Sequence, residues 1–111
     1  MRNDLGYALT MAGRYSEAAD AYEDAYAGRP SASLAAKAYH ARLAGRLAEP
    51  EKLLKQWLDL QPADIGSRLL LAEAQVRSGA RKDAVAQYQI VLQSRPRIVP
   101  ALNNLAWLYY E

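Results

Sequence analysis

Few side chains in this 111-residue sequence are of types that catalyse reactions. Its single histidine, His40, lies in an alanine-rich stretch with no acidic residue at helical spacing. A catalytic or metal-binding histidine needs such a partner to orient it, so we interpret His40 as a packed or surface residue. Asp20, Glu23 and Asp24 are clustered, but their spacing places them on the polar face of an amphipathic helix. This pattern favours solvated carboxylates over a catalytic pair.

Other reactive groups are missing from the sequence. It has no cysteine, which excludes disulfides, thiolate metal sites and cysteine nucleophiles. It also has no glycine-rich phosphate loop, no cluster of metal ligands and no nucleophile elbow. We therefore predict that the protein is not an enzyme and needs no cofactor or metal.

The charge of the chain is modest. A net charge of +2 is too weak to indicate nucleic-acid binding. Short basic groups occur at Arg77/Arg81/Lys82 and at Arg95/Arg97. They are interpreted as solvated helix ends, with contact to an anionic polysaccharide as the alternative. No apolar run approaches the length of a transmembrane helix, so the chain is predicted to be soluble as given.

The elements that must position these side chains follow an internal repeat. Residues 5–30 read "LGYALTMAGRYSEAADAYEDAYAGRP" and residues 71–96 read "LAEAQVRSGARKDAVAQYQIVLQSRP", at an offset of 66. Matching positions include Gly13 and Gly79, Tyr22 and Tyr88, and Pro30 and Pro96. A degenerate middle copy contains Gly45, Leu54, Trp57 and Pro62. The period is therefore about half the offset, as in helical repeat proteins.

Glycine and proline punctuate the repeat. Gly13, Gly45 and Gly79 mark a turn inside each copy, and Pro30, Pro62 and Pro96 end each copy because proline cannot continue a helix. Small residues occur where paired helices must approach closely: Gly6, Ala18, Ala72 and Ala84. Asp64 is a suitable N-cap, and Pro100 suits the first turn of a helix. The predicted helices are 2–12, 16–28, 32–44, 48–60, 64–78, 81–94 and 98–110.

This pattern resembles the tetratricopeptide repeat (TPR), a helix–turn–helix unit of 34 residues. The resemblance covers nearly the whole chain and implies an all-α solenoid of antiparallel helix pairs, with about seven helices in a TPR superhelix. We expect one solenoid over residues 1–111. Its repeats are 1–32, 33–64, 65–98 and a half repeat at 99–111. The half repeat predicts that the chain is a fragment of a longer protein.

The middle repeat has two possible registers. If its two-residue shortening follows Pro30, then Leu34, Ala38 and Ala41 face the core, and Tyr39 and Arg42 face the inner surface. If it precedes Gly45, then Ala36, Tyr39 and Leu43 face the core. We prefer the first register, although it places Lys37 at a usually apolar position. In either case Pro50 is predicted to lie in a helix's first turn.

Three stretches narrow the resemblance: "GRLAEPEKLLKQWLDLQPAD", "RLLLAEA" and "ALNNLAWLYYE". They are similar to the C-terminal half of the bacterial TPR lipoproteins associated with PEP-CTERM protein sorting and exopolysaccharide production. That resemblance implies a scaffold in the periplasm or at the outer membrane, anchored through an N-terminal cysteine that this chain lacks. If the chain is not related to these lipoproteins, the expected location is the cytoplasm.

The TPR resemblance also implies a binding surface. The first helix of each pair lines a concave groove that holds a peptide or a partner helix. Carried onto this sequence, the inner positions are Asn3, Tyr7, Thr10, Met11, Tyr39, Arg42, Leu69, Glu73, Arg77, Asn103, Trp107 and Tyr110. The leading hypothesis is therefore a protein-interaction scaffold, and we expect Tyr39→Ala or Glu73→Ala to weaken partner capture without unfolding. The two-carboxylate clamp of chaperone-binding relatives is not expected, because Tyr7, Leu69 and Glu73 occupy its positions.

A structural role is the alternative function. The repeats would then be a spacer in a longer solenoid, or a surface that joins like chains. The last helix carries an apolar face that we expect to be covered by self-association, giving a homo-oligomer. The residues of this face are Leu102, Leu105, Ala106 and Tyr109.

Overall fold

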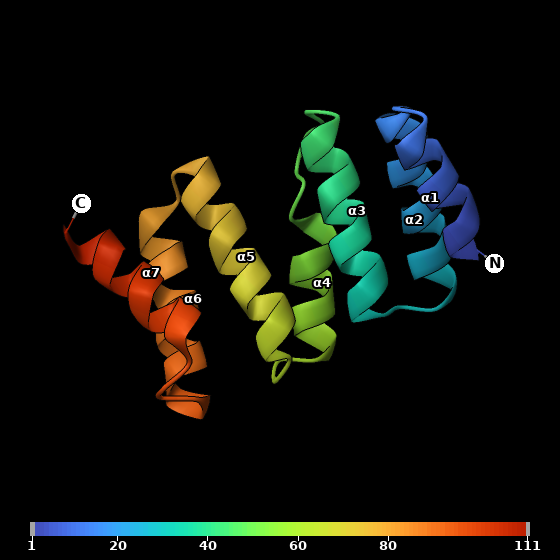
Figure 1. Ribbon diagram of the computed structural model, residues 1–111. Helices are drawn as coiled ribbons and strands as arrows, with labels where there is room; N and C mark the ends of the chain where they lie inside the picture. Colours follow the sequence, from blue (N-terminus) through green and yellow to red (C-terminus); the bar gives the residue numbers. More distant parts are fainter. Residues whose placement is uncertain (1, 111) are drawn as a thin grey trace. The chain divides into compact units, whose positions relative to one another are not determined.

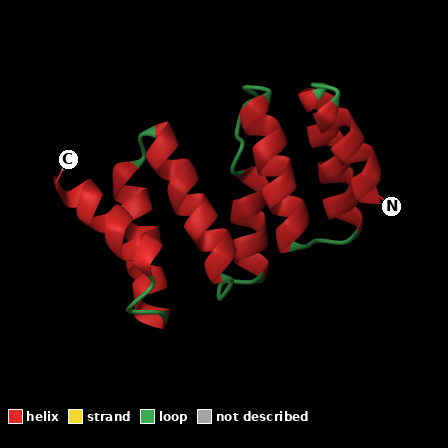
Figure 2. Ribbon diagram, viewed as in Figure 1, coloured by secondary structure: helices red, strands yellow, loops and turns green. Residues whose placement is uncertain are grey.

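The computed structural model describes the backbone of residues 2–110 and the side chains from Leu5 to Tyr110. Over this range the chain forms seven α-helices and no strand (Figures 1 and 2), which confirms the predicted all-α helical repeat fold. The helices are α1 (Arg2–Met11), α2 (Tyr15–Gly28), α3 (Ala32–Ala44), α4 (Lys52–Leu60), α5 (Ile65–Ser78), α6 (Arg81–Ser94) and α7 (Val99–Tyr110). None of these described helices is long and apolar enough to cross a membrane.

The helices form two compact units, Met1–Pro62 and Ala63–Glu111. In the first unit α1 packs on α2, α2 on α3, and α3 on α4. In the second unit α5 packs on α6, and α6 on α7. The boundary between the units follows Pro62, two residues before the predicted end of the second repeat. Within each unit, consecutive helices are therefore neighbours, as expected for helix pairs, while a single continuous solenoid stays a prediction.

Most helix ends lie where capping residues predict them. Asp64 caps α5: its carboxylate accepts bonds from the Ser67 amide at 3.2 Å and the Ser67 hydroxyl at 3.0 Å. Ser31 caps α3 by accepting from the Leu34 amide at 3.1 Å. Gly79 ends α5 with a φ of 85°, a left-handed conformation that glycine adopts without a steric penalty. Pro100 lies in the first turn of α7, as predicted.

Small residues permit the close approach of paired helices. Ala18, Ala72 and Ala84 are fully buried. Gly6 of α1 lies directly against the ring of Tyr22 in α2, because a Cβ added at Gly6 would come within 2.4–2.8 Å of three ring carbons. The expectation that these positions carry helix–helix contacts is therefore confirmed.

Burial on α3 agrees with the preferred register at the three positions that it placed in the core, but not at Tyr39. Leu34, Ala38 and Ala41 are buried on α3, while Ala36 and Leu43 are partly exposed. Because α3 packs against both α2 and α4, a second face of this helix is buried as well. Tyr39 lies on that second face.

The connection between α3 and α4 differs from the prediction. The fourth helix begins at Lys52 rather than at residue 48, so Pro50 lies in a turn before the helix and not in its first turn. Left-handed backbone conformations at Arg46 (φ 55°) and Glu49 (φ 50°) keep this segment from forming a helix. Gly45 has a φ of −84° and serves instead to admit Tyr15, whose Cβ would lie 2.8 Å from an added Cβ.

Candidate functional site

A hollow of about 570 Å³ lies among α1, α2 and α3 in the first unit. Tyr22 and Ala41 are buried and form its floor. Tyr7 and His40 are exposed and stand at its rim, where the Tyr7 side chain is 63% exposed. Its lining residues are Tyr7, Thr10, Tyr15, Tyr22, Lys37, His40, Ala41, Leu43 and Ala44. We call this feature the tyrosine hollow.

Helical spacing brings the lining side chains together. Tyr7 and Thr10 are three residues apart on α1, and Lys37 and His40 are three apart on α3, so each pair shares a helix face. The Thr10 hydroxyl donates to the Gly6 carbonyl at 2.8 Å, which holds its side chain against α1. Gly6 in turn leaves room for Tyr22 at the floor. The hollow is therefore built by the packing of three helices and not by a loop.

Two predicted groove residues, Tyr7 and Thr10, line the tyrosine hollow. The prediction missed Lys37 and His40, which join them from α3, and also Tyr15 and Tyr22. The one feature of the sequence that could have indicated these residues is Lys37, a charged residue at a usually apolar position of the repeat. His40 is indeed a surface residue, with its ring 5.1 Å from that of Tyr39.

Arg42 is held in a structural clamp. Its guanidinium donates to both carboxylate oxygens of Glu23 in α2, with 3.2 Å from Nη2 to Oε1, and donates to the Ala48 carbonyl at 2.8 Å. The bond from Glu23 raises the pKa of Arg42. Glu23 is therefore not a fully solvated carboxylate, and its ion pair with Arg42 is partly buried. Arg42 joins α2, α3 and the following loop, which differs from the groove role expected for it.

The prediction that Tyr39 lies in the groove is wrong. Tyr39 is only 1% exposed, because α3 is covered on two faces, and it belongs to the core. Tyr39→Ala would therefore remove a buried ring, which destabilises a protein by about 3–5 kcal/mol for large aromatic residues. Met11 is 70% exposed and does not line the tyrosine hollow. The side chain of Asn3 lies outside the described residues.

In the second unit, the groove residues of α5 have different surroundings. Leu69 is partly buried and packs against the core cluster of α5, α6 and α7, so it is not an exposed groove residue. Leu69 is covered because α5, α6 and α7 bury their apolar side chains in one common core. Glu73 and Arg77 are exposed, with 3.8 Å between carboxylate and guanidinium one helical turn apart. Such an exposed pair contributes little to stability.

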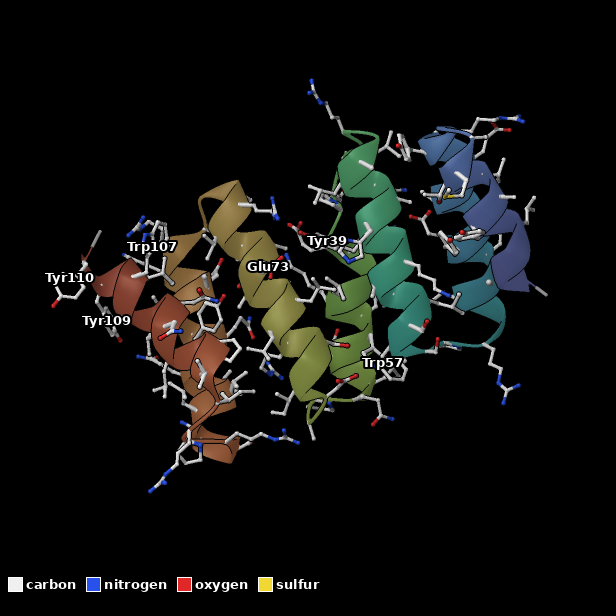
Figure 3. The ribbon with its side chains drawn as sticks, in the orientation of Figure 1. Tyr39, Trp57, Glu73, Trp107, Tyr109 and Tyr110 are labelled. Atoms are coloured by element: carbon white, nitrogen blue, oxygen red, sulfur yellow. The ribbon has the colours of Figure 1, made fainter. Side chains whose placement is uncertain are left out.

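The last helix, α7, presents its predicted groove residues to solvent. Asn103, Trp107 and Tyr110 are exposed, and Figure 3 shows Trp107 and Tyr110 projecting from this helix. The Arg81 guanidinium lies 5.7 Å from the centre of the Trp107 ring and donates to the Leu108 carbonyl at 2.9 Å. Arg81 is therefore attached to α7, in part by a cation–π contact.

The predicted self-association face on α7 is only partly exposed. Leu102 is 44% exposed and Tyr109 is 64% exposed, and Ala106 lies between them on the same face. The Tyr109 hydroxyl accepts a bond from Gln89 Nε2 at 3.0 Å. Leu105 differs from the prediction, because it packs into the core cluster of this unit.

The described residues contain no group of three or more histidine, cysteine or acidic side chains that could hold a metal ion. The tyrosine hollow offers hydroxyl groups, an ammonium group, an imidazole and apolar surface. Such groups can recognise a ligand by hydrogen bonds, charge and burial of apolar area. Recognition is the chemistry that this arrangement supports.

Comparison with known proteins places the fold. No protein-family model and no curated protein matches the chain. Among solved structures, the chain is similar to the first TPR domain of Spaghetti (RPAP3) bound to the HSP90 peptide SRMEEVD. The TM-score is 0.78 at 20% sequence identity, over 98% of this chain and 88% of that chain. The similarity to a TPR domain supports the all-α helical repeat fold expected from the repeat pattern.

Proposed function

We propose that this chain is a protein-interaction module whose first unit binds a segment of a partner protein in the tyrosine hollow. The observation that carries the proposal is the hollow itself, in which Tyr7, Tyr15 and Tyr22 gather among three helices. Tyrosine contributes strongly to recognition, because its ring buries apolar area while its hydroxyl keeps a hydrogen-bonding group. The structurally similar TPR domain of RPAP3 also holds a peptide.

The dimensions of the hollow suit a peptide. About 570 Å³ is within the range of roughly 300–1,000 Å³ typical of ligand pockets, enough for a few side chains. Its floor is buried, so little ordering is needed there on binding. The exposed Tyr7 ring can lose much of its solvent-accessible area when a ligand covers it. We therefore assign binding, and not catalysis, to this site.

Peptide selection with matched variants tests the proposal. Random dodecapeptides displayed on phage would be selected on the intact chain, and the affinity of a selected peptide measured by fluorescence polarisation. We expect Tyr7→Ala to weaken binding about tenfold or more, as loss of an anchoring aromatic residue does. Met11→Ala is the control, since Met11 is similarly exposed on α1 but lies outside the hollow. Equal affinities for the two variants would contradict the site.

The finer family resemblance supports a narrower proposal. The stretches at 45–64, 68–74 and 101–111 are similar to the PEP-CTERM-associated lipoproteins, which suggests a module of a bacterial envelope protein linked to protein sorting and exopolysaccharide. Cell fractionation followed by immunodetection tests this location. Detection in the cytosolic fraction alone would contradict it.

Self-assembly through α7 is the second candidate function. The helix has no charged residue and exposes Leu102, Trp107 and Tyr109. Ala106 follows Ala72 by one repeat of 34 residues, and Ala72 is fully buried in the core cluster with Ala84 of α6. The equivalent face of α7 is exposed, so a helix of a second copy could cover it. Exposed apolar side chains of this kind favour association.

A further inference from the structure

We infer that the segment bound in the tyrosine hollow carries an acidic side chain, whose carboxylate is held by Lys37 and His40. This inference rests on the proposed function and adds the chemistry of the ligand. Both residues line the hollow from α3. They are three residues apart, so their Cβ atoms lie on neighbouring positions of the helix surface, about 5–6 Å apart. One carboxylate group can accept hydrogen bonds from both.

The balance of charge in the hollow favours an anion. Lys37 supplies three N–H donors and His40 supplies at least one, and the hydroxyls of Tyr7 and Tyr15 can also donate. Among the described residues that line the hollow, none is acidic. A ligand carboxylate would therefore meet donors and positive charge without a competing negative group at the lining.

Two carboxylates of α2 are already paired with arginines. Glu17 accepts from the Arg14 guanidinium, with 2.6 Å from Nη2 to Oε2, and Glu23 is held by Arg42. Asp24 lines a separate hollow, next to Leu5 and Pro30. Within the part of the chain that the structure describes, Lys37 forms no ion pair. Its ammonium group is therefore available to a ligand.

The apolar surroundings strengthen such a contact. Ala41, Leu43 and Ala44 of α3 also line the hollow, together with the buried Tyr22 of α2. A bound segment would displace water here, and a charge-assisted hydrogen bond is stronger where water is excluded. The same surface accepts an apolar side chain. The structure therefore predicts a peptide with an aspartate or glutamate next to an apolar or aromatic residue.

The test begins with the same random dodecapeptide selection on the intact chain. We expect enrichment of Asp or Glu beside an apolar residue. A selected peptide containing glutamate would then be compared with its Glu→Gln counterpart. We expect about tenfold weaker binding of the amide, because hydrogen bonds to charged groups contribute more than neutral ones. Affinity for the acidic peptide should also fall as salt is raised.

Variants of the chain assign the effect to its residues. Lys37→Gln and His40→Gln should each weaken the acidic peptide several-fold and leave the amide peptide almost unaffected. Lys55→Gln removes an exposed lysine of α4 outside the hollow and serves as the matched control. Circular dichroism and thermal melting would show that each variant stays folded. A loss confined to the acidic peptide and to Lys37 and His40 supports the inference.

The contrary outcomes separate the inference from the function on which it rests. Selected peptides that depend on Tyr7 but lack acidic residues, with Lys37→Gln binding as well as the unmodified chain, would overturn the carboxylate site and leave the peptide-binding function. Failure to select any peptide would overturn the proposed function and the inference with it. An equal loss with Lys55→Gln would mean that general charge attraction, and not this site, holds the peptide.

Discussion

At the scale of single residues, Tyr26 and Tyr88 are both buried, yet their hydroxyl groups have different surroundings. The Tyr88 hydroxyl accepts a hydrogen bond from Asn104 Nδ2 at 3.1 Å, which connects α6 to α7. The Tyr26 hydroxyl is buried without a hydrogen-bond partner among the described residues. A buried polar group without a partner costs stability, whereas a bonded one contributes to it.

Replacing each tyrosine by phenylalanine measures this difference. We expect Tyr88→Phe to lower the free energy of unfolding by about 1 kcal/mol, because it removes the bond to Asn104. Tyr26→Phe should leave the stability unchanged or raise it, because it removes an unpaired hydroxyl at constant ring volume. Urea unfolding of both variants gives the comparison. A larger loss with Tyr26→Phe than with Tyr88→Phe would contradict the assigned contacts.

The same hydroxyls make stability depend on alkaline pH. Burial raises the pKa of Tyr26 and of Tyr88 above the ordinary 10.0 of tyrosine. Below pH 10 both the folded and the unfolded chain hold these protons, so the full stability is present. Above it the unfolded chain loses them first, and the free energy of unfolding falls as pH rises through the folded-state pKa.

Urea midpoints measured between about pH 9 and pH 11 test this dependence. We expect a decline for the unmodified chain and a shallower decline for the double variant Tyr26→Phe/Tyr88→Phe. Identical slopes for the two proteins would show that other groups cause the alkaline loss of stability.

At the scale of helices and turns, the connection after α3 carries backbone strain that the other turns avoid. Gly13 and Gly79 adopt left-handed conformations at φ 76° and 85°, whereas in the middle repeat this role falls to Arg46 at φ 55°. A side chain with a Cβ is disfavoured there by about 1–2 kcal/mol. Gly45, one residue earlier, has a φ of −84° and serves the close approach of Tyr15 instead.

Arg46→Gly should therefore stabilise the chain. We expect a gain of about 0.5–1 kcal/mol in the free energy of unfolding, since the relief of strain exceeds the extra flexibility of glycine in the unfolded chain. Gly13→Ala is the converse change, at a position where an added Cβ meets no atom within 4 Å. It should destabilise through backbone strain alone. Stabilisation by Gly13→Ala would contradict this explanation.

The exposed face of α7 leads to a prediction about assembly. Sedimentation at increasing concentration should show association of the unmodified chain. The exposed face of α7 carries no charge, so two copies can pack this face together without electrostatic repulsion. Leu102→Glu introduces a charge on this face and should give a monomer. Gln93→Glu adds the same charge at an exposed position of α6 and should associate normally. An unmodified chain that stays monomeric at high concentration would contradict self-assembly.

At the scale of the whole molecule, the fold was predictable because the residues that define the repeat determine helix ends and helix contacts locally. Gly79, Pro96 and Asp64 end or begin helices by their own stereochemistry, and the small residues mark helix contacts. The start of α4 was not predictable, since it depends on left-handed conformations at Arg46 and Glu49. Arginine and glutamate adopt these conformations only rarely.

The candidate site was predicted only in part, for a similar reason. Tyr7 and Thr10 follow from the repeat register. Lys37 and His40 become part of the site only through the packing of α3 against α2, and the partnership of Arg42 with Glu23 joins residues 19 positions apart. Burial of Tyr39 likewise depends on α3 being covered on two faces. Contacts of this range have no signature in a single sequence.

The most direct test of the central claim is chemical-shift mapping by NMR of the labelled chain during titration with a selected peptide. Binding in the tyrosine hollow predicts the largest amide shifts at residues of α1 and α3 that line it, including Tyr7, Thr10 and His40. Residues of α7 should shift little. Shifts concentrated on α7, with the amides of the hollow unchanged, would contradict the account and transfer recognition to the second unit.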